Sequence, residues 1–259
     1  VSLPDIVTLD TIRSAFFPVI HKKYWYYTAY FCMSFFVPAM NHLIQTFPRS
    51  QLQLLVLSGA VLFSVIPTCT GKDLFSTMGG YTVFWLMYLY ILGGYLSRYP
   101  VSKASSRNYL VLYLFFVAVT CLHKLYPDFF GPVKGMPLLE YTSPTILGCA
   151  VCLLVFLSHC AFPKCLQSVI RFAAPLSFGV YLLHAQGTVY SIFMKNRFGP
   201  LGAYHTAVML LAVLAIAAFW FLLGIAVEYI RQKLFKRLNI SNLCKKLDSL
   251  QEKCLSDTK

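Results

Sequence analysis

Long apolar stretches separated by short polar segments dominate this sequence. Seven windows each contain a run without Asp, Glu, Lys or Arg over about the 20 residues that a helix needs to cross a hydrocarbon core of roughly 30 Å, or fall a few residues short of that length. The windows cover residues 24–45, 51–69, 79–97, 108–123, 142–162, 174–194 and 205–230. The pattern predicts an all-α fold, a polytopic membrane bundle with about seven transmembrane helices.

The connections between the windows are mostly short and rich in turn-forming residues, so sequential helices are predicted to pack antiparallel in one bundle. Segment 124–141 is longer and holds three prolines and two glycines, which predicts a structured loop rather than an eighth span. We expect one transmembrane domain over residues 1–238 and a polar cytoplasmic tail over 239–259. Apolar residues at helical spacing among cations after Tyr229 indicate either a basic amphipathic segment on the inner leaflet or a solvated positive flank.

Composition and charge support a membrane protein and give it an orientation. Hydrophobic residues make up 58% of the chain and charged residues only 12%, against about 25% charged residues in a soluble domain. The net charge of +13 could indicate nucleic-acid binding, but the basic residues lie scattered between the apolar windows, so no nucleic-acid partner is predicted. When the connections between the windows are assigned alternately to the two sides of the membrane, one side holds 14 of the 22 Lys and Arg residues and the other side holds 8. The positive-inside rule then places the C-terminus in the cytoplasm.

His184 stands near the middle of the window 174–194, and no other Asp, Glu, Lys, Arg or His lies as deep in any window. A polar ring in hydrocarbon costs free energy, so it either serves a function in a bundle interior or acts as hydrogen-bonded packing between helices. Ser177 and Tyr181 precede it at helical spacing and are predicted to share its face. Either hydroxyl could orient the imidazole or set its tautomer.

Other polar and aromatic residues are candidates for contact with a substrate or cofactor, although each could instead have only a structural role. Trp85 and Tyr88 share a helix face that could line a substrate cavity or simply pack. Asn41 closes the first span near the cytoplasmic side. Arg98 closes the third and could bind a phosphate of a cytosolic cofactor or act as a positive-inside anchor. Cys149 and Cys152 form a C-x-x-C without further ligands, so no metal site is predicted.

The string APLSFGVYLLH over 174–184 resembles the late-helix SFGVYLIH motif of the bacterial acyltransferase 3 family of membrane O-acyltransferases. Further segments are similar to its polysaccharide O-acetyltransferase-like branch, and together they span nearly the whole chain. These are residues 17–20 with 24–26, Tyr30, Pro38 and Asn41; 79–81 with Trp85, 88–90, Gly93 and Tyr95; 141–144; and 228–235.

This resemblance implies transfer of an acetyl or other short acyl group from acetyl-CoA or another acyl-CoA to a hydroxyl of a cell-surface glycan or lipid-linked sugar, in the cytoplasmic membrane of a bacterium, without a metal. It implies His184 as a catalytic or acceptor-side group and Arg98 as a contact for the acyl-CoA. It also implies that Trp25, Asn41, Trp85, Tyr88, Ser177 and Tyr181 contact substrate. Membrane lipids are the other expected partners.

Family members usually have about ten spans, and their first helix carries an arginine and a catalytic histidine that this chain lacks. The resemblance therefore implies a chain without the first three spans, and we expect it to be inactive or slow alone. Two alternatives stay open: a transporter or flippase for a lipid-linked glycan, and a fragment that only packs or assembles.

Overall fold

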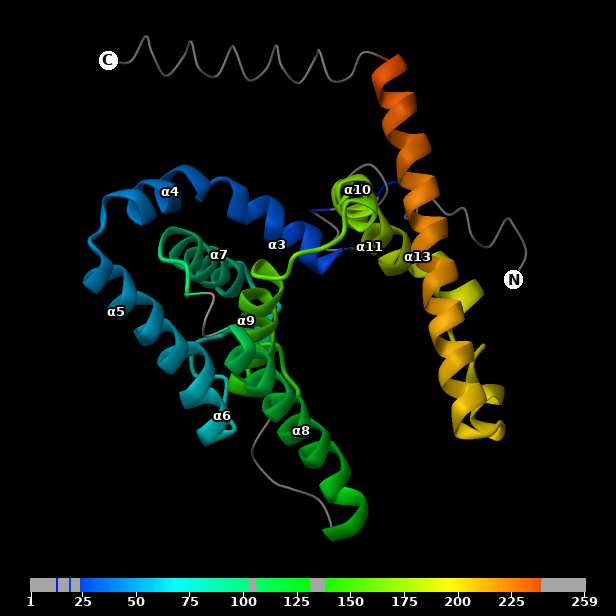
Figure 1. Cartoon of the computed structure of the whole chain (residues 1–259), viewed down its shortest axis with the longest axis horizontal. Coiled ribbons are helices and arrows are strands. Elements are labelled where there is room, and N and C mark those ends of the chain that lie inside the picture. Colours follow the sequence, from blue (N-terminus) through cyan, green and yellow to red (C-terminus); the bar gives the residue numbers. More distant parts are fainter. Residues whose placement is uncertain (1–12, 14–18, 20–23, 103–105, 131–137, 239–259) are drawn as a thin grey trace. The chain divides into compact units, whose positions relative to one another are not determined.

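The computed structural model describes residues 13, 19, 24–102, 106–130 and 138–238, and these residues form helices and connections without a β-strand (Figure 1). The predicted all-α membrane class is confirmed. Four helical runs are long and apolar enough to cross a membrane, namely Arg49–Thr70, Ser106–Tyr126, Lys164–Ala185 and Thr206–Arg237. The described residues divide into two compact units, an N-terminal unit that ends at residue 161 and a C-terminal unit that begins at residue 162. The number of seven spans stays a prediction.

The described residues of the N-terminal unit form seven α-helices, one short π-helix and one 3₁₀ turn. Hydroxyl side chains begin two of the helices, because Thr82 accepts a hydrogen bond from the Trp85 N–H and Ser143 accepts one from the Ile146 N–H. The elements are α3 (Trp25–Ser34), α4 (Val37–Thr46), α5 (Arg49–Ala60), a π-helix (Val61–Val65), α6 (Ile66–Thr70), a 3₁₀ turn (Met78–Gly80), α7 (Val83–Arg98), α8 (Ser106–Phe130) and α9 (Pro144–Ser158).

Three of the predicted spans in this unit are interrupted or short. Window 24–45 is divided between α3 and α4, and Pro38, which has no N–H to donate, lies in the first turn of α4. Helix α7 has 16 residues and α9 has 15, both below the length of a straight span.

The prediction that residues 124–141 form a loop is wrong in its first part. Helix α8 continues to Phe130, because polar residues beyond the apolar window can extend a helix outside the hydrocarbon. Residues 131–137 lie outside the described residues. Helices α8 and α9 approach closely at Gly148, where an added Cβ would lie 2.5 Å from the Phe116 ring.

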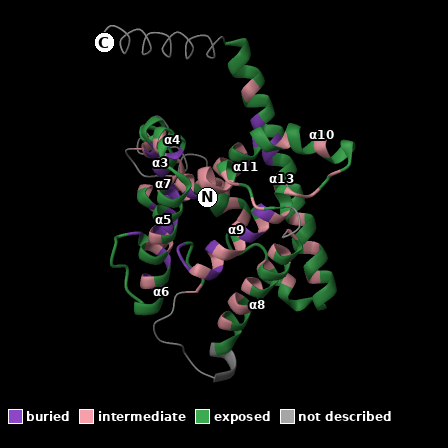
Figure 2. Ribbon diagram, turned by 60° about the vertical axis from the view of Figure 1, so that its left-hand side comes forward, coloured by how far each residue is buried: buried purple, intermediate pink, exposed green. Residues whose placement is uncertain are grey.

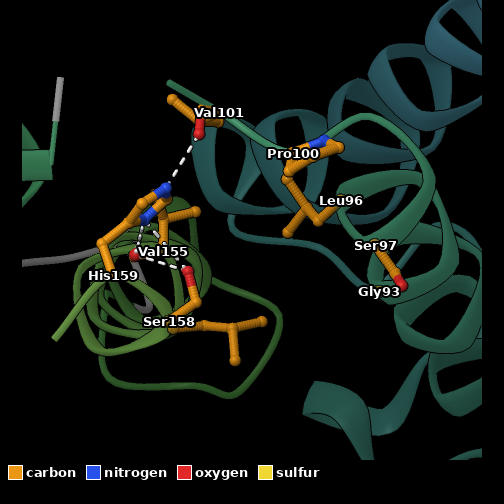
Figure 3. A pocket seen from close by; sticks show the side chains of 9 residues that line it. Gly93, Leu96, Ser97, Pro100, Val101, Val155, Ser158 and His159 are labelled. Atoms are coloured by element: carbon orange, nitrogen blue, oxygen red, sulfur yellow. Dashed lines mark hydrogen bonds between the residues drawn. The ribbon is translucent and has the colours of Figure 1, made fainter. Parts of the chain in front are cut away.

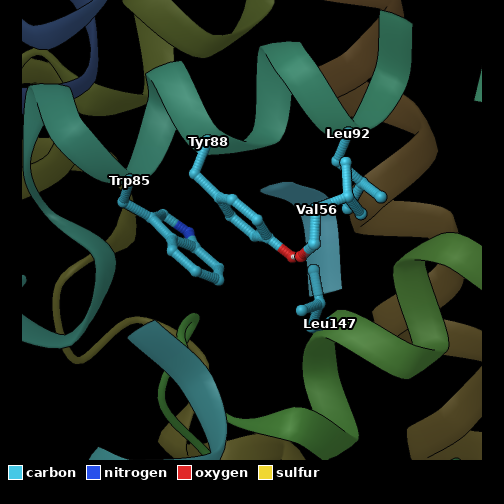
Figure 4. Close-up of a cluster of buried hydrophobic side chains, with 5 residues drawn as sticks. All are labelled: Val56, Trp85, Tyr88, Leu92 and Leu147. Atoms are coloured by element: carbon cyan, nitrogen blue, oxygen red, sulfur yellow. Dashed lines mark hydrogen bonds between the residues drawn. The ribbon is translucent and has the colours of Figure 1, made fainter. Parts of the chain in front are cut away.

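The core of the N-terminal unit gathers around α7. Val56, Trp85, Tyr88, Leu92 and Leu147, which come from α5, α7 and α9, form its main buried cluster (Figure 4). Most of the remaining helix surface is exposed and drawn green in Figure 2. Many of these exposed side chains are large and apolar. Such an apolar exterior suits helices that face lipid.

The C-terminal unit is built on the contact of α11 (Ser177–Ala185) with α13 (Thr206–Arg237). Gly179 faces Glu228 and Gly224 faces Val180, and added Cβ atoms would lie 2.5 Å from Glu228 and 3.0 Å from Val180. Small residues thus let the two backbones approach. The remaining elements are α10 (Lys164–Ala173), a 3₁₀ turn (Ala174–Leu176), α12 (Gly187–Val189), a π-helix (Tyr190–Met194) and a 3₁₀ helix (Gly199–Ala203).

A single helix over the window 174–194 was expected, and this expectation is wrong. Gln186 has extended backbone angles, φ −70° and ψ 116°, so α11 ends at Ala185. The Gln186 Oε1 atom accepts a hydrogen bond from the Val189 N–H at 2.7 Å and begins the next helix. His184 therefore lies in the last turn of a helix rather than in the middle of one.

The last helix behaves as the sequence predicts. Helix α13 continues from the apolar window through the basic segment to Arg237 without interruption. An intrahelical ion pair lies near the end of this helix: Arg231 donates from Nε and Nη2 to the two carboxylate oxygens of Glu228 at 2.7 and 2.6 Å.

Candidate functional site

His184 is held by its own helix. Its Nδ1 atom lies 2.8 Å from the Val180 carbonyl oxygen, and its ring packs edge-on against Trp220 with centroids 5.8 Å apart. A carbonyl oxygen can only accept, so Nδ1 carries the proton of the neutral ring and Nε2 carries the lone pair. The half-buried imidazole can therefore accept a proton or a hydrogen bond through Nε2.

Ser177 and Tyr181 lie on the same helix as predicted, but neither orients the imidazole. The Ser177 hydroxyl donates to the Ala174 carbonyl at 2.7 Å, and the Tyr181 ring lies 5.9 Å from that of Phe178. The Val180 carbonyl fixes the tautomer of His184 instead.

Trp85 and Tyr88 are core residues in this structure. Trp85 is 3% exposed and Tyr88 is 6% exposed, and their rings lie 5.3 Å apart (Figure 4). The Tyr88 hydroxyl donates to the Val56 carbonyl across to α5 at 3.3 Å. Neither side chain lines any of the described cavities. Their predicted contact with substrate stays a prediction, and the packing alternative accounts for every contact they make here.

Asn41 and Arg98 link α4 to α7. The Asn41 carbonyl oxygen accepts from the Tyr90 hydroxyl at 2.8 Å. Arg98 donates from Nη1 to the carbonyls of Ile44 and Phe47 at the end of α4, which satisfies acceptors that a helix C-terminus leaves open. Its Nε and Nη2 atoms make no further hydrogen bond within the described part of the chain. Arg98 can therefore hold α4 and still present donors to an anion.

Two guanidinium groups gather at the end of α7. The Cζ atoms of Arg98 and Arg49 lie 5.2 and 5.4 Å from the centroid of the Tyr99 ring, which supports both cations electrostatically.

A cavity of about 330 Å³ opens between the ends of α7 and α9 (Figure 3). Its wall includes Gly93 and Ser97 from α7, and Ser158 and His159 from the end of α9. The His159 ring spans two elements, with Nδ1 2.9 Å from the Val155 carbonyl and Nε2 2.9 Å from the Val101 carbonyl. The sequence pattern does not single out His159, because this residue lies at the polar end of its window, where hydropathy does not distinguish a functional residue from a terminal one.

The connection between α6 and α7 is a constrained loop. The Asp73 carboxylate accepts hydrogen bonds from the Thr77 N–H, the Thr77 hydroxyl and the Met78 N–H at 2.8, 2.9 and 2.6 Å. The desolvation of the carboxylate by its neighbours is the largest single influence and acts to raise the pKa of Asp73, but these hydrogen bonds together hold that pKa below its ordinary value. Ser76 and Met78 have positive φ angles of 51° and 49°, which are costly for residues with a side chain.

Trp25 lies beside this loop. Its ring is 4.4 Å from that of Tyr81 and 6.1 Å from that of Tyr141, and the two tyrosine rings are 5.3 Å apart. The three aromatic residues come from α3, from the loop before α7 and from the segment before α9.

The candidate residues therefore belong to two groups. Trp25, Asn41, Trp85, Tyr88 and Arg98 lie in the N-terminal unit, whereas Ser177, Tyr181 and His184 lie in the C-terminal unit. Each group has its own geometry, and the roles assigned to its members stay predictions.

Several long apolar helices and a half-buried histidine within one of them define a multi-pass membrane protein. The acyltransferase domain family, acyltransferase 3, matches residues 4–232 of the 259 residues, and the chain belongs to this family. The resemblance inferred from the sequence motifs is thus confirmed. No curated protein and no solved structure matches the chain.

Proposed function

We propose that this protein transfers an acetyl or other short acyl group from acyl-CoA to a hydroxyl of a cell-surface glycan in a bacterial cytoplasmic membrane. The observation that carries the proposal is the family match over residues 4–232. The distribution of Lys and Arg supports an orientation with the C-terminus and the α7–α8 connection in the cytoplasm.

In this proposal, acyl-CoA binds at the cytoplasmic end of α7. Arg98 and Arg49 supply two guanidinium groups there, and the free donors of Arg98 suit phosphate oxygens. The cavity between α7 and α9 adjoins this end and offers apolar walls with the hydroxyls of Ser97 and Ser158, which suit the pantetheine arm.

His184 is proposed to act on the acceptor. Its Nε2 lone pair accepts the proton of the sugar hydroxyl while the hydroxyl oxygen attacks the thioester carbonyl. The carbon–sulfur bond then breaks, the acyl group stays on the sugar oxygen, and the leaving thiolate takes up a proton as free CoA. The contact of Nδ1 with the Val180 carbonyl supports this role, because it keeps Nε2 unprotonated in the neutral ring.

A transfer assay with the protein in lipid nanodiscs tests the role of His184. Radiolabelled acetyl-CoA and an oligosaccharide acceptor are supplied, and acetylated sugar is counted. His184→Ala should lower kcat by roughly 10²–10⁴-fold if Nε2 is the general base, with unchanged protein yield. The matched control is His205→Ala, an exposed histidine at the start of α13. Equal activity of both variants would refute the role. No turnover by the unmodified chain would instead agree with the expectation that the chain is inactive alone, and would count against His184 as a sufficient base.

Filling the cavity tests the acyl-CoA site. An added Cβ at Gly93 meets no atom within 4 Å, so the side chain of Gly93→Leu can begin without a clash and extend into the cavity that Gly93 lines. We expect a raised KM for acetyl-CoA with an unchanged melting temperature. Gly202→Leu, also in open space, is the control. An unchanged KM would place the donor elsewhere.

Cysteine labelling tests the orientation. In a background without cysteines, Lys72→Cys should react with an impermeant maleimide from outside the cell, whereas Arg107→Cys should react only after permeabilisation. The opposite pattern would reverse the orientation.

A further inference from the structure

Helix α10 has two sharply different faces. Its apolar residues recur at steps of three and four and share one face, and its polar residues share the opposite face. The apolar face holds Leu166, Val169, Ile170 and Ala173, and the polar face holds Lys164, Gln167, Ser168 and Arg171. No residue of α10 is buried, and the exposed fractions of Leu166, Val169 and Ile170 lie between 41% and 55%. The described residues therefore leave most of the apolar face uncovered.

Helix α10 does not continue α11 as one straight span, although the run Lys164–Ala185 is long enough to cross a membrane. A 3₁₀ turn that contains Pro175 separates the two helices, and α10 runs across the direction of α13 (Figure 1, Figure 2). A position inside the hydrocarbon would also place the Arg171 guanidinium there, which is costly. At a membrane surface, by contrast, the apolar face reaches the acyl chains while the polar face stays among the headgroups.

The end of α10 meets the basic end of α13. The Phe172 ring lies 5.8 Å from the Tyr229 ring of α13. Lys233 stands one turn after Tyr229 on the same face, with its Nζ atom 4.7 Å from the centroid of that ring, and Lys236 follows on this face. Cations of both helices therefore gather at one end of the C-terminal unit.

These cations have no acidic partner. Glu228 is the only acidic residue in the range 162–238, and Arg231 engages both of its carboxylate oxygens. The exposed cations Arg171, Lys233 and Lys236 form no ion pair within the described part of the chain. A nucleic acid or an acidic peptide would neutralise them but would leave the apolar face of α10 in water, whereas an anionic bilayer complements both features.

From these observations we propose that α10 lies in the membrane interface and that its polar face, together with Lys233 and Lys236 of α13, binds the phosphate groups of anionic phospholipids. In the proposed orientation these lipids belong to the cytoplasmic leaflet. The proposal does not depend on acyl transfer, because it rests only on the faces and charges of the two helices.

Quenching by brominated lipid tests the placement of α10. In a background without cysteines, a bimane fluorophore is attached to Val169→Cys on the apolar face or to Ser168→Cys on the polar face. The protein is placed in phosphatidylcholine nanodiscs that contain a small fraction of lipid brominated in the upper part of its acyl chains. The apolar face of an interfacial helix reaches roughly 5–10 Å into this region, so the probe at Val169→Cys should be quenched more strongly. Equal quenching at the two positions would overturn the interfacial placement.

The probe at Val169→Cys also tests the choice of headgroup. Brominated phosphatidylglycerol should quench more than brominated phosphatidylcholine at the same mole fraction. Each cation near an anionic surface contributes about fivefold to the enrichment of the anionic lipid, which corresponds to ~1 kcal/mol. Combining Arg171→Gln, Lys233→Gln and Lys236→Gln should therefore lower the enrichment by about fivefold or more.

The matched control removes the same charge from three separate places, by combining Lys72→Gln, Lys124→Gln and Lys195→Gln. All six substituted side chains are exposed, so neither variant alters the packed core. Enrichment that is lost in the first variant and kept in the control supports the site, whether or not the chain transfers an acyl group. Equal losses in the two variants would show a general positive flank without a site, and no preference for phosphatidylglycerol in the protein that carries only the probe would exclude an anionic-lipid site. Either result overturns the proposal and leaves the proposed function standing.

Discussion

Replacing Asp73 by Ala should loosen the loop between α6 and α7 without disturbing the helices. The carboxylate accepts three hydrogen bonds, from Thr77 N–H and hydroxyl and from Met78 N–H. Buried bonds to a charged acceptor contribute about 1.5–3 kcal/mol each, but Asp73 is exposed, so we discount each to about 0.5 kcal/mol and the sum to ~1.5 kcal/mol. The positive φ angles of Ser76 and Met78 cost about 1 kcal/mol each and would lose the contacts that oppose them.

Hydrogen exchange followed by mass spectrometry measures this effect locally. Amides in residues 74–80 should exchange roughly tenfold faster in Asp73→Ala at pH 7, as ~1.5 kcal/mol implies, whereas amides in α7 should not change. Asp73→Asn, which keeps a carbonyl acceptor, should give a smaller increase. Lys72→Ala is the control, since this exposed neighbour makes no side-chain contact with the loop among the described residues. Unchanged exchange over 74–80 in Asp73→Ala would refute the role of the carboxylate.

The same carboxylate predicts a pH dependence. Because the folded state lowers the pKa of Asp73, its stabilisation is complete above the ordinary carboxyl pKa of 3.8 and is lost as the pH falls through the lower folded value. Loop protection in the unmodified protein should therefore be constant from pH 7 to pH 5, corrected for the intrinsic exchange rate, and should fall below about pH 3.8. Asp73→Asn should lack this step, and a matching acid step in Asp73→Asn would assign it to another group.

Three further substitutions probe packing, each read from the melting temperature in detergent. Tyr88→Phe should lower the free energy of unfolding by only about 0.5–1 kcal/mol, because the hydrogen bond to the Val56 carbonyl is long at 3.3 Å. Tyr88→Ala should lower it by about 3–5 kcal/mol, because it opens a cavity in the core. Similar losses in the two variants would contradict the packing role. Gly179→Ala should cost about 1–3 kcal/mol through its clash with Glu228, and Gly187→Ala, in open space, should cost little. Arg98→Ala should destabilise the end of α4 by about 1 kcal/mol and Arg98→Lys by less; no change in either would show that these carbonyls are satisfied by water.

The fold class follows from the sequence because the hydrocarbon core demands about 20 apolar residues in a helix, and this demand is visible as uninterrupted apolar windows. Where helices break inside a window is a local matter. Pro38 signals the break between α3 and α4 in the sequence, since it lacks an N–H. Gln186 gives almost no such signal, because glutamine is compatible with a helix, and its extended conformation depends on the bond that its side chain makes to the next helix.

The candidate site was predictable in part. Helical spacing correctly placed Ser177, Tyr181 and His184 on one helix. The partner of the imidazole is a backbone carbonyl, which every residue carries, so the sequence cannot single out Val180. The sequence does not distinguish an aromatic residue that packs in the core from one that lines a groove. Trp85 is buried in the core, whereas Trp25 lines a groove.

The π-helix at Val61–Val65 changes how sequences of this family should be compared. The Ile66 N–H donates to the Val61 carbonyl five residues back, so the segment contains one residue more than an α-helical turn would hold. Each residue in an α-helix turns the chain by about 100°, and the extra residue therefore resets which side chains after it face inward. Consider a homologue that has one residue fewer within the segment aligned with Val61–Val65. The same side chains before and after this segment would face inward in that homologue only if the segment forms a regular α-helical turn. An engineered deletion within Val61–Val65 should accordingly be accommodated as an ordinary turn, whereas the same deletion in α7 would rotate half of the core outward.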